Sequence, residues 1–358
     1  MMDQLLRVRA MRLEELKKGS WEVLPGPVLR PSSAGWDSHS SMTPVVFRNA
    51  DAGLSSQPEY GMLYIGSGHR SSSWGVGFAA SSDLFNWTRH HGNPVLMQCE
   101  GAGLQLDAPC LVRTDGGYTL ICEEKKVAGG AGTALRKLLS PGTKQALRRI
   151  RRVAGLERPT VVNHASGRYF VSFTSRDIFN WDTAGKKVVF EKGDEGAFDG
   201  HGVFSPQVYR FGRDYYLFYG GTDGLKAYTG LAVSQGLGSR WRRASVKPVL
   251  SPGVRGEWDE VNALIVSVMK LDDCYCAFYE GEDSQRRYSI GMAWSDDLLN
   301  WVKWEGNPVI APGRARYCEH MVCGPRVFAE GDELFLFFNA HGRDMRGTCG
   351  VAVFRRDR

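Results

Sequence analysis

Hydrophobic residues occur along this chain in short runs, in which apolar and aromatic side chains cluster or alternate with polar ones. Residues 215–219 (YYLFY) and 334–338 (LFLFF) are examples, and such aromatic strings are typical of β-strands. Glycine, aspartate or asparagine follows most of these runs, and the chain contains 43 glycines, which suits a protein with many turns. The pattern therefore predicts an all-β protein built from many short strands.

One stretch of the sequence occurs twice in nearly identical form. Residues 79–96 read AASSDLFNWTRHHGNPVL, and residues 293–310 read AWSDDLLNWVKWEGNPVI. Both contain a small residue, serine, an acidic turn, leucine, Asn-Trp and Asn-Pro-Val in the same register, which is improbable by chance. We therefore infer an internal repeat.

The full repeat covers residues 43–96, 205–250 and 266–310, and each copy reads as four short strands joined by tight turns. A four-stranded sheet repeated around an axis is the blade of a β-propeller. Shorter copies cover residues 106–124, 157–175 and 323–338, which makes six repeat starts in all. The second start lacks an outer half and the third has a degenerate one, so the two could share a blade. We therefore predict a five-bladed β-propeller, with six blades as the alternative.

The two ends of the chain predict how the ring closes. The last copy, which ends at residues 349–354, lacks the strand that contains Trp and Pro-Val. That element occurs near the N-terminus, at residues 21–31 (WEVLPGPVLRP). An N-terminal strand that completes the last blade would close the ring and cover an exposed edge. We expect residues 1–20 to be an N-terminal extension and residues 21–358 to be a single propeller domain with the catalytic site.

A basic segment at about residues 126–156 interrupts the β pattern. From Lys125 to Arg152 it has nine basic residues and no acidic one, and its leucines recur at helical spacing on both sides of a Ser-Pro-Gly break. It predicts an inserted helical hairpin. The hairpin is either a solvated lid or a surface that contacts an anionic membrane or a lipid-linked sugar. Nucleic acid is not expected as a partner, because no aromatic stacking platform accompanies the charge.

Charge, N-terminal sequence and cysteine content favour a cytoplasmic protein. The basic insertion could also place it peripherally at the inner membrane. The net charge is only +6, and the first 20 residues have no uninterrupted apolar core of a secretory signal. The eight cysteines contain no CxxC pair, which is typical of buried free thiols in a reducing compartment. Zinc-ligand spacings, phosphate loops and nucleophile elbows are absent from the sequence, so no metal or required cofactor is predicted.

Acidic residues and histidines recur just before the innermost strand of each predicted blade, where a propeller brings them together in one central funnel. These positions hold Asp37, His39, Asp107, Glu157, Arg158, Asp199, His201, Asp259, Glu260, Glu319 and His320. Acids can also cap turns by accepting backbone N–H groups, so any single one has a structural alternative. A ring of carboxylates suits glycosidic bond cleavage, which needs one protonated carboxyl and one ionised carboxylate. A third carboxylate can tune the acid, because nearby negative charge raises a carboxyl pKa.

Four motifs carry a resemblance to a known group: SDDLLNW with NPVI, LDAP, ERP and GHGV. Together they are similar to the five-bladed furanosidase-type glycoside hydrolases, nearest to family 43, with families 32 and 130 as relatives. The resemblance implies that Asp37 is the base or nucleophile, Asp107 the modulator and Glu157 the acid. Glu260 and Glu319 remain alternatives for the acid. His201 is similar to the central histidine of family 43, which implies a structural cation near it in the channel.

The leading hypothesis is a glycosidase that cleaves a furanoside or a short oligosaccharide in the central funnel. The residues expected to bind the carbohydrate are His39, Arg158, Asp199, His201, Glu260, Glu319, His320 and Arg326. One alternative is a family 130-like phosphorylase or transglycosylase that uses Arg158, Arg326 and His320 as anion ligands. Another is a catalytically silent sugar-binding propeller in polysaccharide or glycolipid assembly.

Overall fold

The computed structural model describes residues 11–54, 57–68, 74–97, 104–126 and 167–356, together with the backbone of a short strand, β1 (Leu6–Arg7). The predicted helical insertion at about residues 126–156 lies almost entirely outside the described residues, as do Glu157 and Arg158. The described chain is dominated by strands, as the sequence predicts. Its helical elements are α1 (Leu13–Lys18) and a short 3-10 turn, η1 (Arg316–Cys318). Within the described residues, no helix combines the length and apolar character that crossing a bilayer requires.

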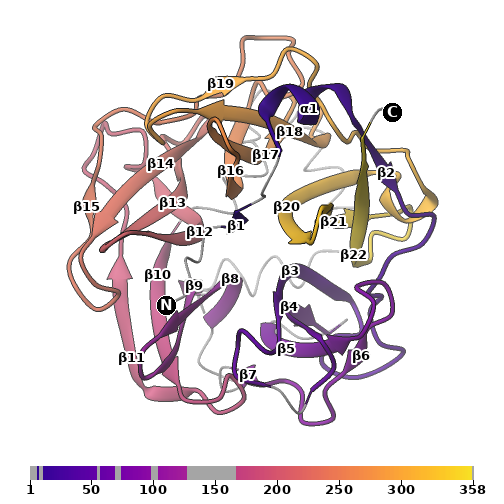
Figure 1. Cartoon of the computed structure of the whole chain (residues 1–358). Helices are drawn as coiled ribbons and strands as arrows, with labels where there is room; N and C mark the ends of the chain where they lie inside the picture. Colours follow the sequence, from indigo (N-terminus) through magenta and orange to yellow (C-terminus); the bar gives the residue numbers. More distant parts are fainter. Residues whose placement is uncertain are drawn as a thin grey trace, which may run out of the picture.

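Antiparallel pairing groups all described strands except β1 and β7 (Leu96–Met97) into five units of four strands each. The first unit contains β3 (Ser40–Arg48), β4 (Tyr60–Ser67), β5 (Trp74–Ser81) and β6 (Thr88–Arg89), and β7 also pairs with β5. The second unit contains β8 (Leu104–Thr114), β9 (Gly117–Lys126), β10 (Arg168–Ser175) and β11 (Asp182–Phe190). The third unit contains β12 (Gly202–Phe211), β13 (Asp214–Thr222), β14 (Ala227–Ser234) and β15 (Arg242–Arg243). The other two are β16 (Asn262–Lys270), β17 (Tyr275–Glu282), β18 (Tyr288–Ser295) and β19 (Val302–Lys303); and β20 (Met321–Glu330), β21 (Glu333–His341), β22 (Gly347–Arg355) and β2 (Ser20–Val23). Parallel pairs between β14 and β16 and between β22 and β3 link neighbouring units, and β1 runs parallel to β16. Figure 1 shows the units arranged around a common centre, with β3, β8, β12, β16 and β20 innermost, a propeller-like fold.

The last unit is completed from the N-terminus, as the sequence predicts. Strand β2 pairs antiparallel with β22, from Ser20 opposite Arg355 to Val23 opposite Ala352. Trp21 lies with its ring 5.3 Å from the rings of both Phe278 and Phe354. A strand near the N-terminus and the last described strand therefore complete one sheet together.

Two of the predicted repeat starts share one sheet. Strand β10, at the end of the repeat start expected over residues 157–175, pairs with β9 along its whole length, from Arg168 opposite Lys125 to Ser175 opposite Tyr118. It is the third strand of the second unit. The prediction of a separate sheet beginning at this repeat start is therefore wrong, because β9 already pairs with the inner edge of β10. The alternative prediction, that the second and third repeat starts share one sheet, is confirmed.

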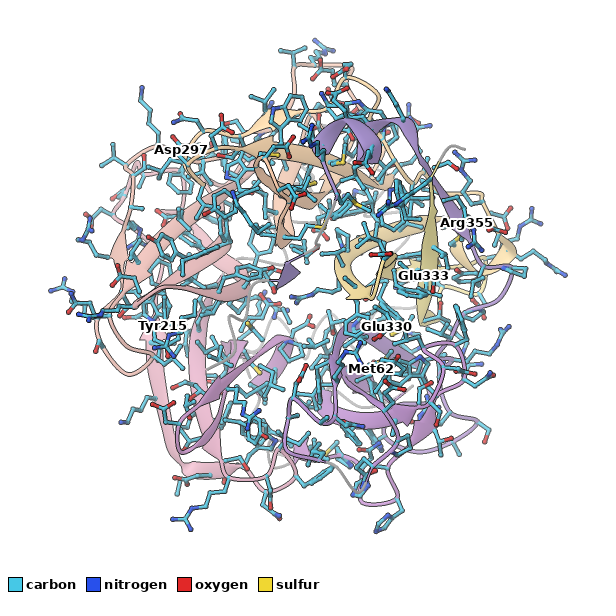
Figure 2. All side chains as sticks on the ribbon, in the orientation of Figure 1. Met62, Tyr215, Asp297, Glu330, Glu333 and Arg355 are labelled. Carbon is cyan, nitrogen blue, oxygen red and sulfur yellow. The ribbon has the colours of Figure 1, made fainter. Side chains whose placement is uncertain are left out.

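The repeated sequence that ends the third strand is a hydrogen-bonded turn. Asp83 Oδ1 accepts the backbone N–H groups of Phe85 and Asn86, its Oδ2 accepts the Asn86 amide, and Trp87 Nε1 donates to the Leu84 carbonyl. The bonds from the Asn86 backbone and side chain lower the pKa of Asp83 to about 2. The same acceptor pattern recurs at Asp177 and at Asp297, which lies at the outer edge of the molecule in Figure 2. The repeat therefore encodes turn chemistry.

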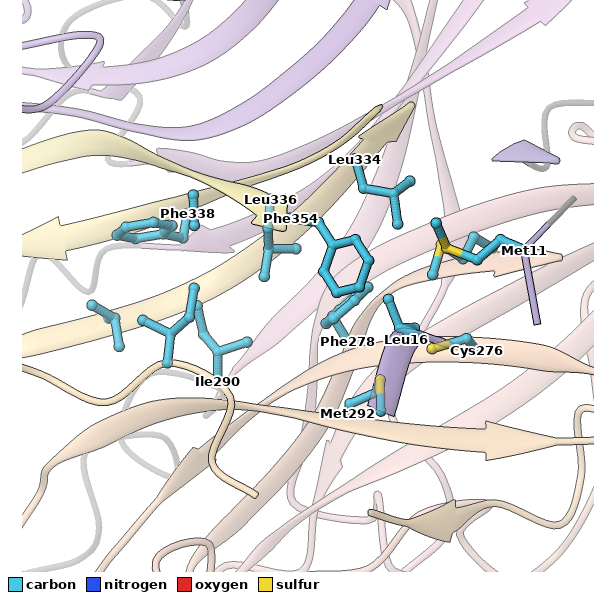
Figure 3. Close-up of a cluster of buried hydrophobic side chains, with 14 of the residues drawn as sticks. Met11, Leu16, Cys276, Phe278, Ile290, Met292, Leu334, Leu336, Phe338 and Phe354 are labelled. Carbon is cyan, nitrogen blue, oxygen red and sulfur yellow. The ribbon is translucent and has the colours of Figure 1, made fainter. Parts of the chain in front are cut away.

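Hydrophobic clusters fill the spaces between neighbouring units. The largest, shown in Figure 3, joins the fourth and last units through Phe278, Met292 and Phe338. Met11 and Leu16 from the N-terminal segment are 0% and 2% exposed within it. Fully burying such side chains contributes about 1.5–3 kcal/mol each, so this segment is held by the core of the propeller-like body.

Candidate functional site

Asp37 lies just before β3 and is buried in a network of donors. It is 2% exposed, and its Oδ2 accepts hydrogen bonds from Arg89 Nε at 2.8 Å and the Tyr64 hydroxyl at 3.0 Å. Trp36 stacks on the Tyr64 ring at 5.7 Å. The carboxylate therefore ties the start of the inner strand to the second and fourth strands of its unit.

The same arrangement is built twice more. Asp199 accepts from Arg243 at 2.7 Å and from Tyr219 at 2.9 Å. Asp259 accepts from Lys303 at 2.6 Å and from Tyr279 at 3.1 Å. We call these three sets the Asp-Tyr-cation triads: Asp37–Tyr64–Arg89, Asp199–Tyr219–Arg243 and Asp259–Tyr279–Lys303. Recurrence at one structural position in three units favours a role in holding each unit together. Asp37 differs from the other two in that its Oδ2 also accepts a hydrogen bond from the Ser41 hydroxyl at 3.4 Å.

A second group of carboxylates lies within inner and second strands. Asp107 of β8 and Glu123 of β9 are directly opposite each other in the strand register, and they are 7% and 1% exposed. Asp107 stands at a bulge, where its Oδ1 accepts the N–H of Ala108, a residue with a φ of 46°. Glu123 pairs with Arg168 Nη1 at 3.0 Å and accepts the N–H of Ser205 at 3.0 Å. Two carboxylates are thus held side by side in the second unit.

The fourth unit places two more carboxylates on β17. Glu280 accepts from Asn262 Nδ2 at 3.2 Å and from the Gly324 N–H at 2.8 Å. Glu282 is 0% exposed and accepts from the Tyr288 hydroxyl at 2.8 Å. Both carboxylates are therefore fixed in position by donors.

Several of these groups also connect neighbouring units. Glu123 binds the N–H of Ser205 and Glu280 binds that of Gly324, and Asn339 Oδ1 binds the N–H of Thr43 in the same way at 2.5 Å. Each donor has a positive φ and precedes a proline on the inner strand of the next unit. These side chains hold the bulges of adjacent inner strands in register.

Carboxylates of the second and fourth units lie within electrostatic reach of Cys323 in β20. Burial raises the pKa of the Cys323 thiol well above its usual value, and the carboxylates of Glu280, Asp107 and Glu282 raise it further. We call Asp107, Glu123, Glu280 and Glu282 the central carboxylate cluster. Arg326 follows Cys323 by three residues in β20. Burial lowers the pKa of Arg326, and the nearby carboxylate of Glu280 opposes that decrease. The centre of the molecule thus combines several carboxylates with the guanidinium groups of Arg326 and of Arg168, which pairs with Glu123.

The remaining predicted site residues lie around the end where the inner strands begin. Glu260 accepts the N–H groups of Gly256 and Ser284, and the Ser284 hydroxyl, followed by the Gly256 amide, lowers its pKa. Glu319 is gripped by Arg343 at 2.7–2.9 Å, which lowers the pKa of that carboxyl. Both acids are therefore held in their ionised form by local donors.

Histidines gather at the same end. Burial lowers the pKa of His341, and the neighbouring His39 and His320 lower it further. His201 lies beside the turn at Gly224, 3.5 Å from the position a Cβ would take there. In the part of the chain that the structure describes, no group of three or more His, Cys, Asp or Glu side chains is arranged to hold a metal ion. A cation near His201 therefore stays a prediction.

Sequence reasoning found Asp107 but missed Glu123, Glu280 and Glu282. The missed acids lie on second strands, inside the strings TLICEE and AFYEGE. An acid in the middle of a buried aromatic strand is the signal that could have found them, because a charge is rarely buried without a partner.

The comparisons with known proteins point to the fold. No family model and no curated protein matches the chain. Among solved structures, BT0996 in a complex with RGII aligns with a TM-score of 0.68 and 18% identity over 94% of this protein and 92% of that one. A glycosyl hydrolase from Bacteroides ovatus aligns with a TM-score of 0.64 and 17% identity, over 94% and 93%.

Two further structures are similar in shape but differ in described activity. One comes from a study of β-1,2-mannoside hydrolases within the GH130 family of mannoside phosphorylases, with a TM-score of 0.63 and 15% identity over 98% and 96% of the two proteins. The other is an N-acetylgalactosamine deacetylase from F. plautii, with a TM-score of 0.61 and 12% identity over 94% and 95%. At these identities the likeness establishes a propeller-like fold, and it does not single out family 43.

Proposed function

We propose that this protein is a carbohydrate-active enzyme, and specifically a glycosidase whose acid and base come from the central carboxylate cluster. The observation that carries the proposal is that Asp107 lies opposite Glu123 in the second unit, while Glu280 of the fourth unit binds the N–H of Gly324, and Asp107, Glu280 and Glu282 all lie within electrostatic reach of Cys323. Cleavage of a glycosidic bond needs two carboxyl groups on opposite sides of one bond, and carboxylates from separate units can supply them. Similar folds among proteins described as glycoside hydrolases support the assignment.

Asp107 is the strongest catalytic candidate in this proposal. It belongs to the LDAP motif, and it lies beside a second carboxylate, Glu123, at a bulge. Glu157, the acid that the resemblance implies, lies outside the described residues and remains the alternative to an acid from the cluster. We assign Asp37 a structural role instead of a catalytic one, because its triad is shared with Asp199 and Asp259.

Finer features belong to the same proposal. The five four-stranded units are taken as the five blades of a closed propeller of the family 43 type, acting on a furanoside or a short oligosaccharide. The cytoplasmic location, and contact of the basic insertion with an anionic membrane or a lipid-linked sugar, remain predictions. A phosphorylase is the second candidate, because Arg326 places a guanidinium within electrostatic reach of Glu280, where phosphate could replace the attacking water.

The test is hydrolysis of a panel of aryl glycosides, mainly furanosides, with and without phosphate. It compares the wild type with Asp107→Asn, Glu282→Gln and, as an exposed control, Asp182→Asn. Loss of about 10²–10⁴-fold in kcat for Asp107→Asn, with an unchanged melting temperature and an active control, is expected for an acid or base. Activity that requires phosphate would support the phosphorylase. A fully active Asp107→Asn variant would refute its role, and inactivity of the wild type on every substrate, with sugar still bound, would leave a binding protein.

A further inference from the structure

A pocket of about 470 Å³ opens beside the start of the last inner strand, β20. Its charged lining consists of Arg30, Arg316, Arg343, Arg346, Glu319 and Asp344. These residues come from three segments that are distant in sequence: the connection after β2, the turn η1, and the hairpin between β21 and β22. Four guanidinium groups and two carboxylates leave a surplus of two positive charges in one concave site.

The carboxylates of the pocket do not neutralise most of these arginines. Arg343 is engaged by Glu319 through three contacts of 2.7–2.9 Å. Arg346 instead donates through Nη2 to the carbonyls of Ser32 at 3.2 Å and Ser38 at 2.8 Å, which fixes its position and leaves its charge.

The other two arginines lack a close counter-charge. Within the described residues, no carboxylate lies at ion-pair distance from Arg30, Arg316 or Arg346. Arg316 lies near enough to Glu319 to help lower its pKa, after the stronger effect of Arg343. Like charges brought together from separate segments repel one another, and a bound anion would remove that cost.

The pocket also adjoins the end of the molecule where the predicted substrate residues lie. Glu319 lines the pocket and immediately precedes His320 and the start of β20. Asp344 lines it too and acts electrostatically on His341, which in turn is close to His39. A carbohydrate bound at this end could therefore place a charged substituent among the arginines.

We propose that this arginine pocket binds the phosphate or carboxylate group of an acidic carbohydrate. The planar guanidinium fork matches both oxyanions with paired N–H donors, which is the geometry of strong recognition. The inference rests on the proposed function, since it names the class of sugar that the enzyme would take. Neutral sugars of the same ring type would bind more weakly, because they would leave the surplus charge uncompensated.

Calorimetric titration tests the proposal without depending on turnover. The probes are a sugar phosphate, an oligogalacturonate and the neutral oligosaccharide of equal length, each with the wild type, Arg316→Gln, Arg346→Gln and the exposed control Arg213→Gln. We expect an acidic probe to bind at least tenfold more tightly than the neutral one, and each pocket variant to lose that preference. The melting temperature should be unchanged for Arg316→Gln and lower by a few degrees at most for Arg346→Gln, which loses its bonds to Ser32 and Ser38. The control should keep the acidic preference, and the preferred probe distinguishes phosphate from carboxylate.

Two outcomes would overturn the proposal: equal affinity for acidic and neutral probes, or an acidic preference that survives in both pocket variants. Failure of the proposed function looks different, since it would show acidic-sugar binding that depends on Arg316 without hydrolysis of any glycoside. Hydrolysis of neutral aryl glycosides combined with no acidic preference would overturn the pocket alone.

Discussion

Replacing Asp37 by asparagine separates a structural carboxylate from a catalytic one, because the chain contains two internal controls. Asp37, Asp199 and Asp259 are 2%, 0% and 1% exposed, and each accepts from one tyrosine and one cation. Removing one partner of a fully buried ion pair costs about 3–5 kcal/mol. Arg89 keeps 29% of its side-chain surface exposed and can be hydrated, so we expect a smaller loss of about 2–3 kcal/mol for Asp37→Asn.

Arg243 and Lys303 are 33% and 27% exposed, so Asp199→Asn and Asp259→Asn should cost similar amounts. At about 1.3 °C per kcal/mol for a chain of this length, each variant should melt about 3–4 °C lower. The assay is thermal unfolding followed by circular dichroism, with glycosidase activity measured well below the lowest melting point. Each of the three single asparagine variants should keep glycosidase activity within a few fold of the wild type. The reasoning is refuted if Asp37→Asn melts like the wild type but loses activity, while the other two variants remain active.

Three other perturbations follow from the fold. Donors at Asp83 and Asp297 lower both pKa values from 3.8 to about 2, so their contribution to folding is complete above about pH 4 and is lost as the pH falls toward 2. Asp297→Ala should therefore lower the free energy of unfolding by about 1 kcal/mol at pH 7 and by much less at pH 2, as measured by acid titrations followed by fluorescence. An equal loss of stability at the two pH values would contradict this reasoning. Trp21→Ala should cost about 2–4 kcal/mol in urea unfolding, because the ring packs on Phe278, whereas a loss below 1 kcal/mol would mean that β2 is not needed. Gly291→Ala puts a Cβ 2.7 Å from the Tyr279 ring and should lower the melting temperature, while Gly238→Ala, which meets no atom within 4 Å, should not.

Much of the fold could be predicted because its signals are local. The Asp83 turn repeats at Asp297 with Asp, Leu, Asn and Trp at the same spacing, and side-chain bonds within four residues explain both. The missing strand of the last unit could also be recognised, because Trp21 and the residues after it match the absent element. Sharing of one sheet by β9 and β10 was harder to predict, since a long segment separates them along the chain.

The candidate site was less accessible to sequence reasoning. Asp37 precedes the inner strand β3, and Asp107 lies at a bulge in the inner strand β8. The residues beside them in the sequence do not show which of the two is structural. Their difference comes from partners that only the fold assembles: Arg89 lies 52 residues from Asp37, whereas Glu123 faces Asp107 across a strand pair. Spacing along the chain identifies the position of an acid, but the donors around it decide what the acid does.

The pairing of β2 with β22 has a consequence for the order of events during synthesis. Its two partners are separated by roughly 330 residues, which a ribosome adds in roughly 15–65 seconds at about 5–20 residues per second. Until then the strand that carries Trp21 has no sheet to join. Sequence-distant pairing of this kind also makes the final search slow. The middle units should therefore form first and the sheet of β20, β21 and β22 should be completed last, and the nascent chain must keep its N-terminal apolar residues from aggregating for most of the time that it is being made.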